Sequence, residues 1–217
     1  MAAKIHPIVA REGWPLLCGM IALGGGLVWL GHVVAGITCW LLAAVLALLF
    51  RDPLREVPSS PLAIVSPADG RVVGTEKVRE GWLNRESLKI STTIAYTDVY
   101  TLRAPIEGKI QQIWSSGTLR RRARVFWVQT DEGDDVLLSI HVNNFLSHLS
   151  CALNAGQRVG QGQRIGMVFG GGEVGVYLPL GSRVEVEIGT QVRGGSNILG
   201  LLVHPQAVSA AAPEQAE

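Results

Sequence analysis

Apolar residues are distributed along this chain in two different patterns. Residues 13–50 form a single run without a charged side chain, whereas the apolar stretches of residues 62–204 are short and separated by glycine and polar residues. The long run is nearly twice the ~20 residues that one spanning helix requires. Gly31 and His32 interrupt it near its middle. We therefore predict a transmembrane hairpin of two short helices over 13–50; a single tilted span with an apolar tail is the alternative.

Basic residues flank this apolar run on both sides. Lys4 and Arg11 precede it, and Arg51 and Arg55 follow it. Because basic residues are retained on the cytoplasmic side of a membrane, both flanks are expected there. A cleaved signal peptide is disfavoured, since its apolar core would be much shorter.

The second region, residues 62–204, has the pattern of an all-β domain. Its short apolar runs are IVS, RVVG, LKISTTIAY, KIQQIW, RVFWVQT, VLLSIHV, RIGMVF, VGVYLP and RVEVEIG. Such runs with turn residues between them predict a β sandwich or barrel. Residues 143–155 are the exception, because their apolar positions fall at helical spacing before Gly156, which predicts a helix.

The remaining segments complete the predicted organisation. Residues 1–12 form an N-terminal cytoplasmic segment, and the proline-rich residues 51–61 form a linker at the membrane surface. The small and polar residues 205–217 are expected to be disordered.

Two glycine-containing segments of the β region resemble one unit used twice. Residues 154–168 and 187–200 share the order Gly-x-x-Val, a glycine turn and a strand. Similar units build the barrel-sandwich domains of biotinyl and lipoyl carriers. Carriers need a lysine at a hairpin tip, and no lysine follows Lys109, which excludes a carrier.

Composition narrows the class of protein. The 217 residues have a formal net charge of +1, so no field for nucleic acid is expected. Only 17% of the residues are charged, which agrees with a membrane segment. The three cysteines have no disulfide or metal spacing.

Four motifs in order resemble the phosphatidylserine decarboxylase family of the short, membrane-attached type. They are FRDPLREVP, IVSPADGRVVG, DVYTLRAPIEGKI, and GQRVGQGQRIGMV followed by VYLP, and they extend over about residues 50–199. The resemblance implies a mainly β, barrel-sandwich-like domain in a pyruvoyl-dependent enzyme of bacterial phospholipid synthesis. Such an enzyme is made as a proenzyme, cuts itself and converts phosphatidylserine into phosphatidylethanolamine. The resemblance also implies a location in the bacterial cytoplasmic membrane, with the β domain on the cytoplasmic side.

Only one of the family's three self-cleavage residues has a counterpart here. The motif SPADG supplies the triad carboxylate as Asp69, whose alternative role is to form a tight turn. Where the family has a site histidine, this chain has Tyr100. A phenol with an ordinary pKa of about 10 is a poor base near neutrality.

The reactive serine of the family also has no counterpart at its expected place. Counting from Phe169 places it at Gly171, and counting back from the motif VYLP places it at Gly172. Without a hydroxyl there is no acyl shift and no pyruvoyl group. Ser182, in a similar Gly-Ser-Arg motif one strand later, is the candidate substitute, and its alternative role is an ordinary loop serine.

Basic side chains supply candidate contacts to anionic headgroups. They are Arg103, which matches the family's R-A-P segment, and Arg120, Arg121 and Arg122 in the run RRRAR. Basic residues near an anionic membrane favour binding, and a solvated turn is the alternative. His141 and His148 offer a relocated base, but they lack further ligands, so no metal is expected.

Two functions follow from these residues. The first is a pseudoenzyme that binds membrane phospholipid without a cofactor, paired with copies of itself or with an active paralogue. The second is an active phosphatidylserine decarboxylase that forms its pyruvoyl group at Ser182. Whether the protein is an enzyme therefore depends on a hydroxyl that the expected position lacks.

Overall fold

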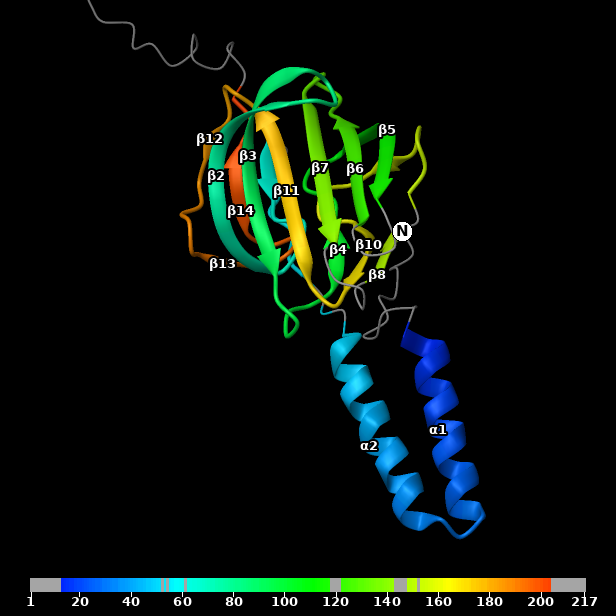
Figure 1. Ribbon diagram of the computed structural model, residues 1–217. Helices are drawn as coiled ribbons and strands as arrows, with labels where there is room; N and C mark the ends of the chain where they lie inside the picture. Colours follow the sequence, from blue (N-terminus) through cyan, green and yellow to red (C-terminus); the bar gives the residue numbers. More distant parts are fainter. Residues whose placement is uncertain are drawn as a thin grey trace, which may run out of the picture.

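The computed structural model describes residues 13–51, 53, 55–60, 62–117, 122–142, 148–151 and 153–203. A pair of helices projects from one end of a domain built from strands (Figure 1). The mainly β fold predicted from the apolar runs is therefore confirmed, and so is the helical hairpin that precedes it.

The hairpin consists of α1, Trp14–Trp29, and α2, Val33–Leu49. Gly31 makes the turn between them with a φ of +88°, a conformation that glycine adopts without strain. Small residues allow the helices to approach closely. A Cβ on Gly36 would lie 2.8 Å from the Gly24 carbonyl oxygen, and Trp40 Nε1 donates a hydrogen bond of 3.3 Å to the Ile21 carbonyl.

Neither helix in the described part of the chain is both long and apolar enough to cross a membrane. The helices contain 16 and 17 residues, which corresponds to about 24 and 26 Å at 1.5 Å per residue. A bilayer core is about 30 Å thick. This corrects the predicted transmembrane hairpin, because the turn at Gly31 divides the apolar run into two arms that are each shorter than a span.

Fourteen strands make up the described β domain. They are β1 Ala63–Val65, β2 Gly70–Glu80, β3 Arg85–Ile94, β4 Thr101–Arg103, β5 Gly108–Gly117, β6 Arg122–Gln129, β7 Asp135–Val142, β8 His148–Cys151, β9 Arg158–Val159, β10 Arg164–Phe169, β11 Gly172–Pro179, β12 Arg183–Val184, β13 Gln191–Val192 and β14 Ile198–Leu201. Eight form a curled sheet in the order β13-β2-β3-β11-β7-β6-β5-β9. Two smaller sheets have the orders β1-β14-β12 and β4-β10-β8.

Buried apolar side chains from all three sheets form one continuous core. Its members include Ile64 on β1, Ile90 on β3, Leu102 on β4, Val168 on β10, Val176 on β11 and Leu199 on β14. Side chains alternate between the two faces of a strand, so Tyr177 of β11 points away from this core and packs with Val125 and Leu137 in a second cluster. Both faces of the central strand β11 are therefore covered.

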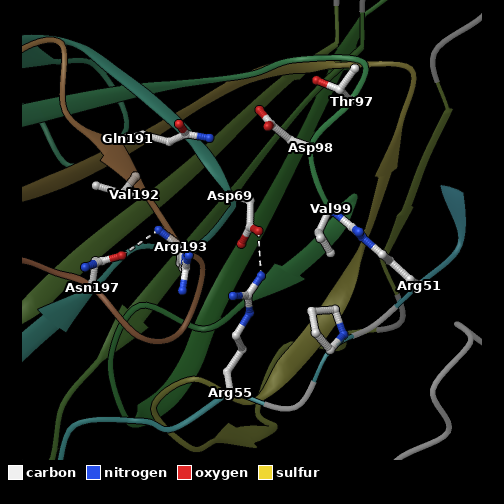
Figure 2. A pocket seen from close by; sticks show the side chains of 11 residues that line it. Arg51, Arg55, Asp69, Thr97, Asp98, Val99, Gln191, Val192, Arg193 and Asn197 are labelled. Carbon is white, nitrogen blue, oxygen red and sulfur yellow. Dashed lines mark hydrogen bonds and ion pairs between the residues drawn. The ribbon is translucent and has the colours of Figure 1, made fainter. Parts of the chain in front are cut away.

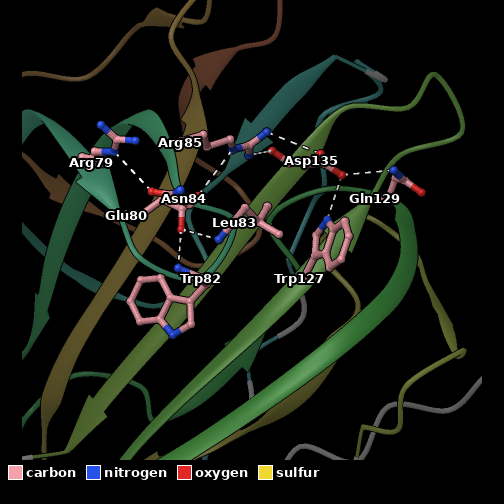
Figure 3. A network of polar contacts seen from close by, with 9 residues as sticks. All are labelled: Arg79, Glu80, Trp82, Leu83, Asn84, Arg85, Trp127, Gln129 and Asp135. Atoms are coloured by element: carbon pink, nitrogen blue, oxygen red, sulfur yellow. Dashed lines mark hydrogen bonds and ion pairs between the residues drawn. The ribbon is translucent and has the colours of Figure 1, made fainter.

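A polar network holds the β2–β3 turn, on the side of the large sheet where Trp82 and Trp127 lie (Figure 3). The buried Glu80 carboxylate accepts hydrogen bonds from the backbone N–H groups of Trp82 and Leu83, at 2.7 and 2.8 Å. Arg85 approaches Asp135, whose carboxylate accepts a bond from Trp127 Nε1. This network fixes the end of the sheet that lies away from the hairpin.

Two predictions about local structure have opposite outcomes. The helix predicted over 143–155 is wrong at residues 148–151, which form strand β8 paired with β10; residues 143–147 and 152 lie outside the described residues. The repeated unit is confirmed. β9 and β13 are each followed by a turn with a positive-φ glycine, Gly162 or Gly195, and then by a longer strand.

Candidate functional site

Strand ends converge where the hairpin joins the β domain (Figure 1). Glu173, near the start of β11, pairs with Thr93 near the end of β3 and with His141 near the end of β7. Arg71, near the start of β2, also pairs with Thr93. Asp69 directly precedes β2, so the register brings it to the same end of the sheet as the glycines before β11.

Asp69 is held by two partners from distant parts of the chain. Its carboxylate accepts a 2.6 Å hydrogen bond from Arg55 Nη2 and a 2.7 Å bond from the Gly194 backbone N–H. Burial raises the pKa of Asp69 above its ordinary value of 3.8, although the Gly194 N–H and the Arg55 guanidinium act in the opposite direction. Asp69 therefore connects the segment after α2, through Arg55, to the turn after β13, through Gly194.

Tyr100 is buried beside the segment that contains the three glycines. Its hydroxyl donates to the Tyr96 carbonyl, and its ring packs edge to face on Phe169 with a centroid distance of 5.1 Å. Phe169 stacks in turn on Phe50 at 5.7 Å. Burial, followed by the negative charge of Asp98, raises the pKa of Tyr100 above 10. The phenolate form of Tyr100, which could accept a proton, is therefore even scarcer near neutrality than that of a free tyrosine.

Residues 170–172 carry the chain from the small β4-β10-β8 sheet to the large sheet. Gly170 and Gly171 have φ values of +78° and +80°, which glycine adopts without strain. A Cβ on Gly172 would lie 2.7 Å from the His141 carbonyl oxygen, and one on Gly171 would lie 3.0 Å from the Ile94 carbonyl oxygen. This backbone therefore favours glycine at all three positions.

Ser182 lies at the other end of strand β11. Pro179, which ends β11, pairs with Ser87 near the start of β3, whereas Gly172 pairs with Ile94 at its end. Seven residues of strand separate the two ends by roughly 23 Å, at ~3.3 Å per residue. The buried Ser182 Oγ has no hydrogen-bond partner among the described residues. The structure thus brings Asp69, Tyr100 and the glycines to one end of the domain and places Ser182 at the opposite end.

The basic candidates occupy different environments. Arg103 is buried, and its guanidinium donates to the carbonyls of Gly162 and Pro53, at 3.2 Å each. Arg122 is exposed at the start of β6, where it lines a shallow surface pocket with Ser115 and Ser116. Arg120 and Arg121 lie outside the described residues. Headgroup binding by these four arginines stays a prediction.

The two histidines lie on strands beside the glycine segment. His141 of β7 pairs with Glu173, and His148 of β8 pairs with Phe169. The described residues contain no group of three or more histidine, cysteine, aspartate or glutamate side chains that could hold a metal ion.

A cavity of about 650 Å³ opens beside Asp69 (Figure 2). Its lining comes from the linker after α2, the β3–β4 loop and the turn after β13: Arg51, Pro53, Arg55, Asp69, Thr97, Asp98, Val99, Gln191, Val192, Arg193 and Asn197. Sequence reasoning assigned only Asp69 of these residues to a site. Arg51 and Arg55 lie in the motif FRDPLREVP, which is the available signal, although their place in the sequence predicts only basic residues that flank the apolar run.

Comparison with known proteins identifies the class of protein to which the chain is similar. The family model described as phosphatidylserine decarboxylase matches residues 42–200, which include Asp69, Tyr100 and the glycine segment. The chain is 34% identical over 205 residues to the phosphatidylserine decarboxylase proenzyme of Nitrosomonas europaea, covering 89% of this chain and 95% of that protein. It is 36% identical over 214 residues to the protein of the same name from Burkholderia cenocepacia, covering 91% and 97%. No solved structure matches.

The chain therefore belongs to the phosphatidylserine decarboxylase family. This family is pyruvoyl-dependent, and it makes the pyruvoyl group from a serine of its own chain. Between Phe169 and Glu173 this chain has only glycines, and their backbone leaves little room for a side chain. The residues of this segment do not fit a pyruvoyl precursor.

Proposed function

We propose that this chain is a non-processing member of the family, which binds membrane phospholipid without decarboxylating it. One observation carries the proposal: the segment that joins β10 to β11 offers no hydroxyl or thiol nucleophile. Self-cleavage needs such a nucleophile next to a base, and here three glycines follow Phe169.

The surroundings of the glycine segment support the same function. The buried hydroxyl of Tyr100 is engaged by the Tyr96 carbonyl, and its raised pKa disfavours proton abstraction. Asp69 is paired with Arg55, so its carboxylate already has a cationic partner. Ser182 lies at the other end of β11 from these groups, which disfavours it as a substitute nucleophile.

The helical hairpin supports attachment to a membrane. Most of its large apolar side chains are exposed, and Trp29 and Val34 beside the turn are 88% and 81% accessible. An apolar surface of this extent is typical of a membrane or protein contact. We propose that the hairpin enters the bacterial cytoplasmic membrane from one side, with the β domain in the cytoplasm.

The mass of the purified protein tests the loss of processing. We expect one chain of 23.2 kDa and no carbon dioxide release from phosphatidylserine, under conditions in which the Nitrosomonas europaea relative serves as the positive control. Two fragments, the smaller with a ketone-reactive N-terminus, would overturn the proposal. A cut at Gly181–Ser182 would support the alternative, an active decarboxylase that forms its pyruvoyl group at Ser182. Carbon dioxide release by the whole chain would also contradict it.

The lipid-binding part has a separate test. The detergent-purified protein should retain phospholipid, identified by mass spectrometry after extraction, and should bind vesicles that contain phosphatidylserine. A protein without bound lipid that also fails to bind these vesicles would contradict this part and leave the processing result unaffected.

A further inference from the structure

The cavity beside Asp69 contains two cationic side chains that the described residues leave without an ion-pair partner. Arg51 follows α2 and Arg193 follows β13, and Figure 2 shows them on opposite sides of the Asp69–Arg55 pair. Arg55 is already bound to Asp69. The Asp98 carboxylate, also in the lining, accepts the Ala95 backbone N–H at 2.8 Å. The cavity therefore has three guanidinium groups and two carboxylates, both of which have partners.

The amide side chain of Asn197 adds a hydrogen-bond donor to the lining of the cavity. The Asn197 Oδ1 accepts a 2.8 Å hydrogen bond from the Arg193 backbone N–H, which leaves the Asn197 NH₂ group to donate. Guanidinium groups bind phosphate oxygens through paired N–H donors. Two arginines and an amide around one cavity thus form a donor set that suits a phosphate group.

The position of the cavity relates it to the exposed surface of the hairpin. Arg51 lies three residues after Leu48, which is 67% exposed near the end of α2. A lipid whose acyl chains packed against the end of α2 would have its phosphate near Arg51, which follows that helix. The cavity volume of about 650 Å³ is within the usual range for small-molecule sites.

We propose that this cavity binds a phosphate group, with Arg51 and Arg193 as its cationic contacts and the Asn197 amide as a further donor. Two sources could supply this phosphate. The first is the headgroup of a membrane phospholipid, and for this source the inference rests on the proposed function. Free phosphate, or a soluble phosphate ester, is the other source. The shared chemistry is a phosphate anion in contact with guanidinium groups from two separate segments of the chain.

The test measures binding to the full-length protein in a phosphate-free detergent. Calorimetry compares inorganic phosphate with phosphatidylserine in mixed micelles, for the wild type and for Arg51→Gln with Arg193→Gln. The matched control is Arg79→Gln, because Arg79 is exposed at the far end of β2 and its guanidinium bonds Asn84 (Figure 3). Loss of charged hydrogen bonds should weaken binding about tenfold or more in the double variant, and the control should stay within about twofold. Thermal unfolding of each variant verifies that the fold is intact.

The outcomes separate this inference from the proposed function. Lipid binding that is weaker in the double variant but not in the Arg79→Gln control supports a headgroup site. Phosphate binding that depends on both arginines, without lipid binding, supports the site but contradicts the lipid part of the proposed function. Unchanged binding of both probes in the double variant overturns the inference and leaves the proposed function intact. A wild type that binds neither probe overturns the inference and contradicts the lipid-binding part of the proposed function.

Discussion

At Gly172 the surrounding backbone favours glycine, although the family has a reactive side chain at about this position. This residue begins β11, and the carbonyl of His141 occupies the space in which its side chain would lie. Gly171 has a positive φ as well as a nearby carbonyl. A hydroxyl cannot be added at either position without local rearrangement, so the absence of the nucleophile is accompanied by a backbone adapted to glycine.

Gly172→Ala should destabilise the β domain. The new Cβ would lie 2.7 Å from the His141 carbonyl oxygen, and such overpacking costs about 1–3 kcal/mol. We expect Tm to fall by about 2–10 °C, as measured by tryptophan fluorescence. Gly181→Ala is the control, because its Cβ would have only the Val203 carbonyl, at 3.8 Å, as a neighbour. Equal Tm values for the two variants would contradict this account.

Asp69 should make stability depend on pH in a defined direction. Because burial raises the pKa of Asp69 above 3.8, the folded state binds this proton more tightly than the unfolded state. The contribution of Asp69 is complete below its ordinary pKa and is lost as the pH rises through the higher folded value. The stability advantage of the wild type over Asp69→Asn should therefore shrink as the pH rises from about 4, as measured by urea unfolding at several pH values. An advantage that grows over this range would show that the direction is wrong.

The site residues differ in how far the sequence identified them. Asp69, Tyr100 and the glycines were found because they occupy motif positions, and the structure places them at one end of the domain. Arg193 was not found, because its position in the same cavity as Arg51 depends on the pairing of β13 with β2. No local pattern records that segments more than 140 positions apart line one cavity.

At the scale of elements, the hairpin was predicted correctly because its signal is local. An uncharged run interrupted by Gly31 is enough to define two helices and a turn. Strand β8 was missed because a short segment with mixed spacing fits a helix or a strand equally well. Its pairing with β10, from Gly166–Cys151 to Phe169–His148, satisfies the backbone groups and decides the outcome.

Gly36→Ala should loosen the contact between the two helices. A Cβ there would contact Val28 and would lie 2.8 Å from the Gly24 carbonyl oxygen, at a cost of about 1–3 kcal/mol. Gly25→Ala is the matched control, since its Cβ would have no neighbour within 4 Å and alanine is the better helix former by about 1 kcal/mol. Circular dichroism at 222 nm in detergent should show a lower Tm for Gly36→Ala and an unchanged or higher Tm for Gly25→Ala. The reverse order would exclude close helix packing at Gly36.

At the scale of the whole molecule, the hairpin and the β domain meet at the candidate site. Phe50 at the end of α2 stacks on Phe169, and Arg55 of the linker pairs with Asp69. Arg103 adds a hydrogen bond to the Pro53 carbonyl. The base of the hairpin is thus built into the same end of the domain as the cavity, which would place a bound headgroup next to the apolar helices.

Charges at the hairpin turn should release the protein from membranes. Trp29→Glu combined with Val34→Glu replaces two highly exposed apolar side chains, and a carboxylate in hydrocarbon costs several kcal/mol. We expect vesicle binding to fall about tenfold or more, as measured by flotation. Ile188→Glu, at a 65% exposed position of the β domain, is the control and should bind as the wild type does. Equal binding by the double variant would contradict insertion of the hairpin.

The sequence by itself determined the two helices, most of the strands and the family, because each of these depends on local periodicity or on the order of motifs. It also determined that the expected position of the nucleophile holds only glycine. The tertiary structure alone decided that Ser182 lies at the far end of β11 from Asp69. It also decided that Arg51 and Arg193 share a cavity. These results depend on strand register and on the meeting of distant segments, which a single sequence does not specify.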